Sequence, residues 1–250
     1  MTKTARLSAL LIATLPLLSF SSFATEKSTL CAPQKYEMAL RFQQQSAEIM
    51  ALQLQTYNIA QQRFQQLLTT EKFEKKPAIV LDLDETVIDN SPLLVRDIQR
   101  CHDYTNWDTW GAWEEKGQPK LIPGAKAFLE HVNQQQVKIF YVSDRFQKNK
   151  AHTLTTLKSL GLPQVDENSV LLDSDSKEVR RQNIKKEYQI IMLFGDSLPD
   201  FSPAFNSKNA VAEQRKQVAK HQAHLGKDWF VLPNASYGAW SQAKLDAWGK

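Results

Sequence analysis

The chain has 250 residues, of which 23% are charged and 42% are hydrophobic, and its formal net charge at pH 7 is +4. This length is sufficient for one domain with a full hydrophobic core. The positive charge is too small to indicate binding to a nucleic-acid polymer or to a membrane surface.

Residues 1–24 have the features of a secretory signal peptide. Lys3 and Arg6 form a positively charged start, a mostly apolar stretch follows, and Ser22-Phe23-Ala24 is a small-x-small cleavage site. The apolar stretch is short for a membrane span and is interrupted by a proline. We therefore predict a secreted, periplasmic protein without a membrane span, with a single domain over residues 25–250.

Two cysteines, Cys31 and Cys101, remain after this segment is removed. An oxidising compartment makes a disulfide between them feasible, and two unpaired thiols are the alternative. Cys31 also raises the alternative of a lipid-anchored N-terminus. Residues 28–30 before it lack the small residue that a lipoprotein signal places just ahead of its cysteine, which favours a soluble secreted protein.

Residues 34–68 predict one long N-terminal helix, because they contain neither Gly nor Pro and follow Pro33, a residue that commonly begins a helix. Apolar residues recur at helical spacings of three, four or seven: Leu40, Ala47, Met50, Leu54, Tyr57, Phe64 and Leu68. We expect this stripe to pack on the main domain. The alternatives are a seam between two subunits of a homodimer and a cofactor site.

Residues 78–81 are a short apolar run that leads directly into acidic residues, which predicts a buried strand of a parallel sheet. Asp82 and Asp84 are two positions apart, so on a strand both carboxylates point to the same face. Adjacent carboxylates are unfavourable unless a cation or a proton lies between them. This favours a hard cation such as Mg²⁺ and phosphate chemistry. The alternative is that the acids cap the next helix or lie in a solvated turn.

Residues 87–122 are irregular in pattern and rich in aromatic residues, among them Tyr104, Trp107, Trp110 and Trp113. Because this segment directly follows the acidic cluster, we predict a small cap-like insert over the site. The alternative is that the rings form the insert's own core, as aromatic side chains usually do.

From residue 123 onward, expected helices and strands alternate, which predicts an α/β fold with a doubly wound parallel sheet. The expected helices are 125–135, 147–160, 177–187, a segment near 209–222 and a last short helix after Asn234. The expected strands are 138–142, 170–172, 190–194 and 229–232.

Polar side chains follow three of the expected strands. They are Asp82 with Asp84, Ser143, and Asp196 with Asp200. In a doubly wound sheet the carboxyl ends of these strands meet at one edge, and a basic helix that starts at Lys177 falls between the second and the third. Phosphoryl transfer requires a nucleophile, an acid/base, metal ligands and phosphate-binding groups, and this set of residues can supply all four.

These residues resemble the four motifs of the haloacid dehalogenase-like (HAD) phosphohydrolases, in the branch with two acidic residues in the last motif. More closely, residues 84–92, the Trp107-x-x-Trp110 pair, residues 122–125 and residues 232–238 are similar to class C nonspecific acid phosphatases. That group includes the bacterial lipoprotein 5′-nucleotidases. The resemblance covers nearly the whole mature chain and implies a HAD-like sheet and a Mg²⁺-dependent phosphomonoesterase.

The resemblance implies a role for each acidic residue. Asp82 would be the nucleophile that forms an aspartyl phosphate. Asp84 would protonate the leaving oxygen and then activate the water that opens this intermediate. The Asp82 carboxylate, the Asp84 backbone carbonyl and Asp196 would bind Mg²⁺, with Asp200 fixing a metal-bound water.

The resemblance also implies that Ser143 and Lys177 bind the phosphate, and that Trp107 and Tyr237 hold the ring of a substrate between them. Lys158 is a second candidate for the motif lysine, but the sequence around Lys177 is closer to the motif.

At position 144 the family usually has Asn, whereas this chain has Asp144. We expect the Asp144 side chain to point away from the phosphate or to pair with Arg145. None of the five histidines has metal-ligand spacing, and the Arg-rich motif of histidine acid phosphatases is absent from the sequence.

The prediction is therefore a secreted phosphomonoesterase of small molecules, with broad specificity that includes nucleoside 5′-monophosphates. One alternative is a phosphotransferase, in which an alcohol replaces water at the aspartyl phosphate. The other is a non-catalytic binding or storage protein on the same scaffold.

Overall fold

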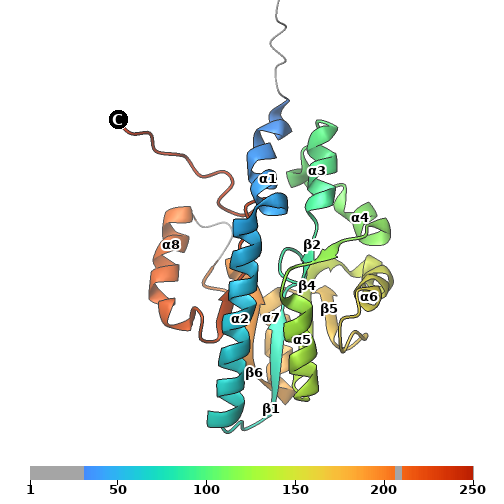
Figure 1. The fold of residues 1–250 in the computed structure, drawn as a ribbon, viewed down its shortest axis with the longest axis vertical. Helices are drawn as coiled ribbons and strands as arrows, with labels where there is room; N and C mark the ends of the chain where they lie inside the picture. The colour runs from blue at the N-terminus through green and yellow to red at the C-terminus, as the bar shows by residue number, and fades with distance from the viewer. Residues whose placement is uncertain (1–30, 206–209, 250) are drawn as a thin grey trace, which may run out of the picture. The chain divides into compact units, whose positions relative to one another are not determined.

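The computed structural model describes residues 31–205 and 210–249, so the proposed signal peptide, residues 1–24, lies outside the described residues. Its centre is a five-stranded sheet in the order β5-β4-β1-β6-β7, with every neighbouring pair parallel (Figure 1). The strands are β1 (Lys76–Leu81), β4 (Lys138–Phe146), β5 (Val170–Asp173), β6 (Tyr188–Gly195) and β7 (Trp229–Val231). The predicted parallel α/β sheet is confirmed.

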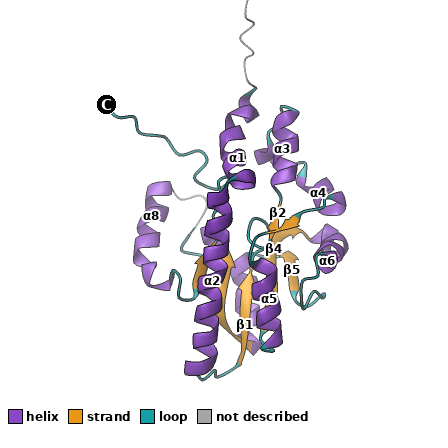
Figure 2. Ribbon diagram, in the orientation of Figure 1, coloured by secondary structure: helices purple, strands orange, loops and turns teal. Residues whose placement is uncertain are grey.

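Different helices cover the two faces of the sheet, because side chains along each strand alternate between the faces. In β1, Ile79 and Leu81 pack with α2 and α5, whereas Ala78 and Val80 pack with Ile184 of α7. Figure 2 shows α2 and α5 lying in front of the strands. The helices around the sheet are α2 (Ala47–Thr70), α5 (Ala125–Gln134), α6 (Lys150–Ser159), α7 (Lys177–Glu187) and α8 (Val211–Lys220). Single 3₁₀ turns add η3 (Gln147–Asn149), η4 (Leu198–Asp200) and η5 (Gln222–His224).

The prediction of one helix over residues 34–68 is wrong, because the chain breaks at Ser46. A 3₁₀ turn, η1 (Ala32–Tyr36), leads into α1 (Glu37–Gln45), and α2 begins at Ala47. Ser46 is extended, with φ −75° and ψ 142°, and its hydroxyl accepts a hydrogen bond from the Ile49 backbone N–H at 3.0 Å. Serine is a favoured N-cap residue because its oxygen satisfies a free N–H of the first turn. Ser46 therefore ends one helix and starts the next.

The break also changes which side of α2 is buried. The buried residues are Ile49, Gln53, Tyr57, Ala60, Phe64 and Leu67. Tyr57 and Phe64 agree with the predicted stripe, but Met50 is 51% exposed. The Tyr57 hydroxyl donates to the Thr86 carbonyl at 2.7 Å, so α2 packs on the main domain beside the loop that follows β1.

Helix α1 packs on the insert rather than on the sheet. Its Leu40 belongs to a separate hydrophobic cluster with insert residues Leu93, Leu94, Ile98, Tyr104 and Trp110. A disulfide joins Cys31 to Cys101, with Cα atoms 5.9 Å apart, so the pairing that the sequence left open is present in the structure. The N-terminal part of the described chain is thus covalently fastened to the insert.

The insert is more regular than its sequence indicated. A short antiparallel pair, β2 (Ile88–Asp89) and β3 (Lys120–Leu121), closes its base. Between them lie α3 (Ser91–Gln99), η2 (Tyr104–Asn106) and α4 (Trp110–Lys116). Tyr104 is fully buried and Trp110 is 5% exposed, whereas Trp107 is 46% exposed. Some of the insert's rings therefore form its core, and Trp107 is free to contact another molecule.

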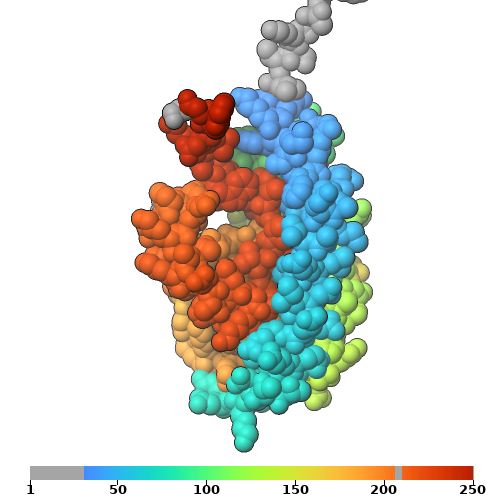
Figure 3. Space-filling view, turned by 60° about the vertical axis from the view of Figure 1, so that its left-hand side comes forward, coloured from blue at the N-terminus to red at the C-terminus, as the bar shows by residue number. Residues whose placement is uncertain are grey.

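The segment after β7 runs along α1 and α2, and Figure 3 shows it in red beside these blue helices. The Gln43 side chain accepts from the Ala235 backbone N–H at 2.9 Å and donates to the Pro233 carbonyl at 3.4 Å. The predicted last helix after Asn234 is wrong, because residues 235–249 form turns and irregular chain. Among the described residues, none of the helices has both the length and the apolar character that crossing a membrane requires.

Candidate active site

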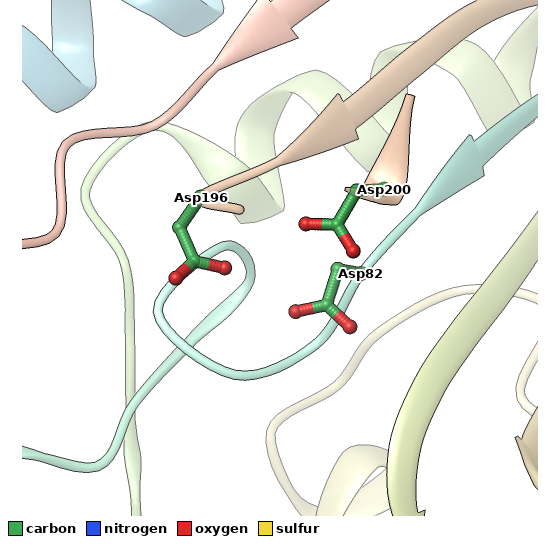
Figure 4. Close-up of side chains that lie close together, drawn as sticks. All are labelled: Asp82, Asp196 and Asp200. Atoms are coloured by element: carbon green, nitrogen blue, oxygen red, sulfur yellow. The ribbon is translucent and has the colours of Figure 1, made fainter. Parts of the chain in front are cut away.

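Three carboxylates meet at the carboxyl edge of the central sheet. Asp82 follows β1, Asp196 follows β6, and Asp200 lies in η4. One carboxylate oxygen from each lies within 4.8 Å of the others, and Figure 4 shows the three side chains close together. Parallel strands that neighbour each other bring their carboxyl ends to the same edge, so residues 114 or more positions apart in the chain become neighbours.

Burial disfavours the ionised forms of these carboxylates. It raises the pKa of Asp82 well above the usual value, although Lys177 opposes the shift. Burial and the neighbouring Asp200 carboxylate raise the pKa of Asp196 to about 7. Carboxylates whose ionised forms are destabilised in this way gain from a cation among them. Three oxygen donors at this separation match the preference of a hard divalent ion.

Lys177 is the cation that the structure places in this group. It is the first residue of α7, which Ser176 caps by accepting a hydrogen bond from the Val179 backbone N–H. The Lys177 Nζ atom lies 2.6 Å from an oxygen of Asp82 and 2.6 Å from an oxygen of Asp200. Burial lowers the pKa of the ammonium, but these two carboxylates outweigh it, so the net shift is upward.

The other lysine that the sequence offered, Lys158, is exposed on α6. The structure therefore brings Lys177, and not Lys158, to the carboxylates.

Hydrogen bonds hold Asp196 and Asp200 in place. Asn234 Nδ2 donates to one oxygen of Asp196 at 2.8 Å, and Thr86 Oγ1 donates to the other at 3.3 Å. The Ser197 backbone N–H donates to Asp200 at 3.0 Å. The Asp200 side chain also packs directly against Gly195, where a Cβ atom would clash with its carboxylate. This close approach explains the glycine before Asp196.

Asp84 lies beside the three carboxylates but has different neighbours. The Ser143 hydroxyl donates to it at 3.1 Å and the Arg145 Nε donates to it at 2.9 Å. Asn90 Nδ2 donates to the same carboxylate at 2.8 Å. Ser143, which we expected to bind phosphate, is completely buried and points to Asp84 in this structure.

Of the two expectations for Asp144, the pairing with Arg145 is wrong, because its partner is Arg180. The Asp144 carboxylate, 67% exposed, accepts from Arg180 at 2.6 Å and lies 3.9 Å from Lys177. Arg180 also donates to the Ser143 carbonyl at 2.6 Å. Arg145 is 3% exposed and is occupied by Asp84. The negative charge of Asp144 is thus compensated by a buried guanidinium.

A cavity of about 690 Å³ lies over these groups. Asp82, Asp84 and Lys177 line it on the sheet side, and Trp107 and Tyr237 are among the aromatic residues that line it elsewhere. The Trp107 and Tyr237 rings meet edge to face, with centroids 5.2 Å apart and planes at 83°. The expected arrangement, with a substrate ring between them, therefore requires one of the two rings to move.

Sequence reasoning missed four polar residues of the site: Asn90, Arg145, Arg180 and Asn234. Arg145 and Asn234 could have been found, because each follows or ends a strand at the same edge as the acids. Asn90 lies in the insert and Arg180 in the middle of α7. Their contacts depend on tertiary packing, which no local pattern in the sequence reveals.

Comparisons with known proteins agree with this geometry. Residues 20–240 match the family model described as HAD superfamily, subfamily IIIB (Acid phosphatase). A structure of the class C acid phosphatase from Bacillus anthracis superposes with a TM-score of 0.78 and 33% identity, covering 83% of this chain and 87% of that one. A second structure of that enzyme, with tungstate bound, gives a TM-score of 0.79 and 32% identity over 86% and 93%.

The family match includes the residues of the acidic edge described above, and the structural matches cover most of both chains. They favour an enzyme over the alternative of a non-catalytic storage protein, because the family and the structural neighbours are acid phosphatases. The chain therefore belongs to the HAD superfamily, subfamily IIIB acid phosphatases, and is a phosphomonoesterase.

Proposed function

We propose that this phosphatase hydrolyses small phosphomonoesters, including nucleoside 5′-monophosphates, with Mg²⁺ and through an aspartyl phosphate on Asp82. The observation that carries the proposal is the position of Asp82. Its carboxylate shares one buried edge with Asp196 and Asp200 and accepts a hydrogen bond from Lys177. A carboxylate held in this way has a fixed direction and a cation that offsets its charge toward an incoming phosphate.

In the first step an Asp82 oxygen attacks the phosphorus, and the bond from phosphorus to the leaving oxygen breaks. Asp84 gives a proton to that oxygen, so that the product leaves as an alcohol. In the second step water attacks the phosphorus, Asp84 takes its proton, and the bond from phosphorus to Asp82 breaks. Inorganic phosphate is released and both aspartates return to their starting state.

Lys177 and Ser143 are proposed to bind the phosphoryl oxygens. Lys177 lines the cavity and already lies within hydrogen-bond distance of the nucleophile. Ser143 lies at the neighbouring strand end, where its hydroxyl can turn from Asp84 to a phosphate oxygen, since a hydroxyl rotates to suit its partner.

The proposed Mg²⁺ ligands are Asp82, Asp196 and the Asp84 backbone carbonyl, with Asp200 fixing a coordinated water. The fit rests on the three clustered carboxylates, of which Asp82 and Asp200 are buried, and on the raised pKa of Asp196, which supports a site that favours added positive charge. When bound, the ion supplies Lewis-acid stabilisation of the negative charge on the transferring phosphoryl group. Both oxygens of Asp200 already accept N–H donors, Lys177 and Ser197, which suits an indirect role.

The leaving group is proposed to lie against the aromatic wall of the cavity. Stacking of a base on an aromatic side chain contributes about 1–3 kcal/mol and tolerates every base. Trp107 is partly exposed and Tyr237 is fixed by a hydrogen bond from its hydroxyl to Glu85. We infer that Trp107 moves and Tyr237 stays when a nucleoside enters.

The signal-like residues 1–24 lead us to propose that the protein is exported to the periplasm. The Cys31–Cys101 disulfide supports this location, because such bonds persist in oxidising compartments. Cell fractionation, with sequencing of the N-terminus of the mature protein, tests the proposal. Recovery of the uncleaved chain in the cytoplasm would contradict it.

The central test is a phosphate-release assay on a panel of nucleotides and sugar phosphates, with EDTA and then with added Mg²⁺. We expect activity to vanish with EDTA and to return with Mg²⁺. Acid quenching during turnover should trap phosphate on the wild-type protein and none on Asp82→Asn. Full activity in EDTA would refute the metal requirement, and labelling of Asp82→Asn would refute the assignment of the nucleophile.

A further inference from the structure

The proposed acid/base Asp84 is surrounded by donors that come from two directions. From the sheet side, Arg145 approaches with Nε at 2.9 Å and Nη2 at 2.9 Å from Oδ1. From the insert side, Asn90 Nδ2 donates to the same oxygen at 2.8 Å. Ser143 donates to Oδ2. A carboxylate has about four acceptor positions, so these contacts restrict Asp84 to one orientation.

The orientation of the Asn90 amide is itself determined by its partners. Its Oδ1 accepts from Trp113 Nε1 at 2.7 Å and from Arg145 Nη2 at 3.1 Å. Both partners can only donate. A flipped amide would place its NH₂ group against two donors and its oxygen against the Asp84 carboxylate. Trp113 and Arg145 therefore force Asn90 to present a donor to Asp84.

Burial makes this arrangement costly to disturb. Asn90 is fully buried and Arg145 is 3% exposed, whereas the Asp84 side chain retains 15% exposure toward the cavity. Hydrogen bonds strengthen in a low-dielectric interior, and an unpaired buried polar group is expensive there. The Asp84 carboxylate thus remains accessible from the cavity, although Asn90 and Arg145, which hold it, are buried.

We propose that Asn90, Arg145 and Trp113 are positioning residues for leaving-group protonation, with Trp113 of the insert acting on Asp84 through the Asn90 amide. The inference rests on the proposed function, in which Asp84 transfers its proton to the leaving oxygen as the phosphorus–oxygen bond breaks. The Trp113 side chain is not part of the cavity lining, so its effect on the reaction passes through Asn90.

The insert also contacts the end of β4, the strand that carries Arg145. Glu114, next to Trp113 on α4, accepts from the Phe146 backbone N–H at 3.2 Å and from Asn149 at 2.7 Å. Phe146 directly follows Arg145. One turn of α4 therefore holds both the amide and the strand end that carries the guanidinium, so a shift of the insert relative to the sheet would move the acid.

The test compares two aryl esters of similar shape, p-nitrophenyl phosphate and phenyl phosphate, with the full mature enzyme and Mg²⁺. Phenolate is the poorer leaving group and depends more on protonation. The quantity measured is kcat/KM, because it reports the steps up to the loss of the alcohol even when a later step limits kcat.

Trp113→Phe removes the Nε1 donor and keeps an aromatic ring. We expect it to lower kcat/KM for phenyl phosphate about threefold to tenfold, and for p-nitrophenyl phosphate by less than about twofold. Arg145→Lys keeps the charge but loses the forked donor, and should show the same selectivity with a larger loss. Equal losses on both esters in these two variants would overturn the proposal.

Two further variants complete the design. Trp248→Phe is the control: it is the same substitution at a fully exposed ring that does not line the cavity, and it should leave kcat/KM for both esters unchanged. Asp84→Asn should lower kcat/KM for phenyl phosphate by about 10²-fold or more, and kcat/KM for p-nitrophenyl phosphate by less. If Asp84→Asn itself affects both esters alike, the proposed acid is wrong; if it discriminates and Trp113→Phe and Arg145→Lys do not, only this inference fails.

Discussion

The edge of the sheet and the insert above it are built on different physical principles. At the edge, Asp82 and Asp196 directly follow strands and Lys177 begins a helix, so a short stretch of sequence places each of them. In the insert, the positions of side chains depend on a disulfide, a separate hydrophobic cluster and contacts with both ends of the described chain. The comparison shows that local rules suffice for the catalytic groups, while long-range contacts set what lies over them.

The strongest test of this comparison removes the cation of the edge. Lys177→Met leaves Asp82 and Asp200 buried together without their shared donor. We expect kcat/KM to fall by at least about 10²-fold and the free energy of unfolding to decrease. Steady-state kinetics and urea denaturation measure the two effects. Lys158→Met, on the exposed face of α6, is the matched control and should leave both unchanged.

Breaking the insert should have a different signature. Replacing both Cys31 and Cys101 by Ala removes a link between residues 70 positions apart and should cost about 2–4 kcal/mol of unfolding free energy. Hydrogen exchange should accelerate in α1 and α3 while β1 and β4 stay protected. Uniform acceleration across the sheet would show that the insert and the sheet are one cooperative unit.

The pH dependence of the unfolding free energy tests the acidic edge of the sheet rather than the insert. Burial raises the pKa of Asp196 to about 7, so between pH 4 and 7 the metal-free native state keeps a proton that the unfolded chain has released. Raising the pH therefore favours unfolding. Because Asp196 is partly exposed, we expect a loss of only about 1–3 kcal/mol over this range in EDTA.

Saturating Mg²⁺ should remove this decline, because the ion stabilises the ionised carboxylates. Urea denaturation at a series of pH values, with EDTA and with Mg²⁺, measures both curves. A metal-free protein whose stability rises from pH 4 to 7 would contradict the role of Asp196.

The smallest expected effect is at the surface of the insert. Trp107→Ala removes a ring that is 46% exposed and contributes little to the core. We expect KM for nucleoside monophosphates to rise by the equivalent of about 1–2 kcal/mol, with little change for a small phosphate ester. Equal changes for both substrates would show that the ring only supports the fold.

The sheet and the acidic edge could be predicted because their signals are local. The apolar run 78–81 ends at Asp82, and the segment that follows the strand at 190–194 contains Asp196 and Asp200. Lys177 begins a helix whose cap, Ser176, stands next to it. Given parallel strands, their convergence follows from topology alone.

The rest could not be predicted, for reasons that particular residues make clear. Ser46 carries a cap signal, but the absence of Gly and Pro around it favoured an unbroken helix. Tyr104 donates to the Ser236 carbonyl, 132 positions away, at 2.8 Å. Arg180 donates to the Asp144 carboxylate, 36 positions away, at 2.6 Å. Contacts of this kind are decided by packing, and the sequence offers no spacing rule for them.

The break at Ser46 divides a segment whose composition is typical of one continuous helix. After the break, α2 packs on the sheet through Tyr57 and Phe64. Before the break, α1 packs on the insert through Leu40. The extended backbone of Ser46 thus sets the angle between α1, which contacts the insert, and α2, which contacts the sheet. A continuous helix across Ser46 would move the insert away from the sheet edge and widen the cavity between them, without changing the residues that line either side.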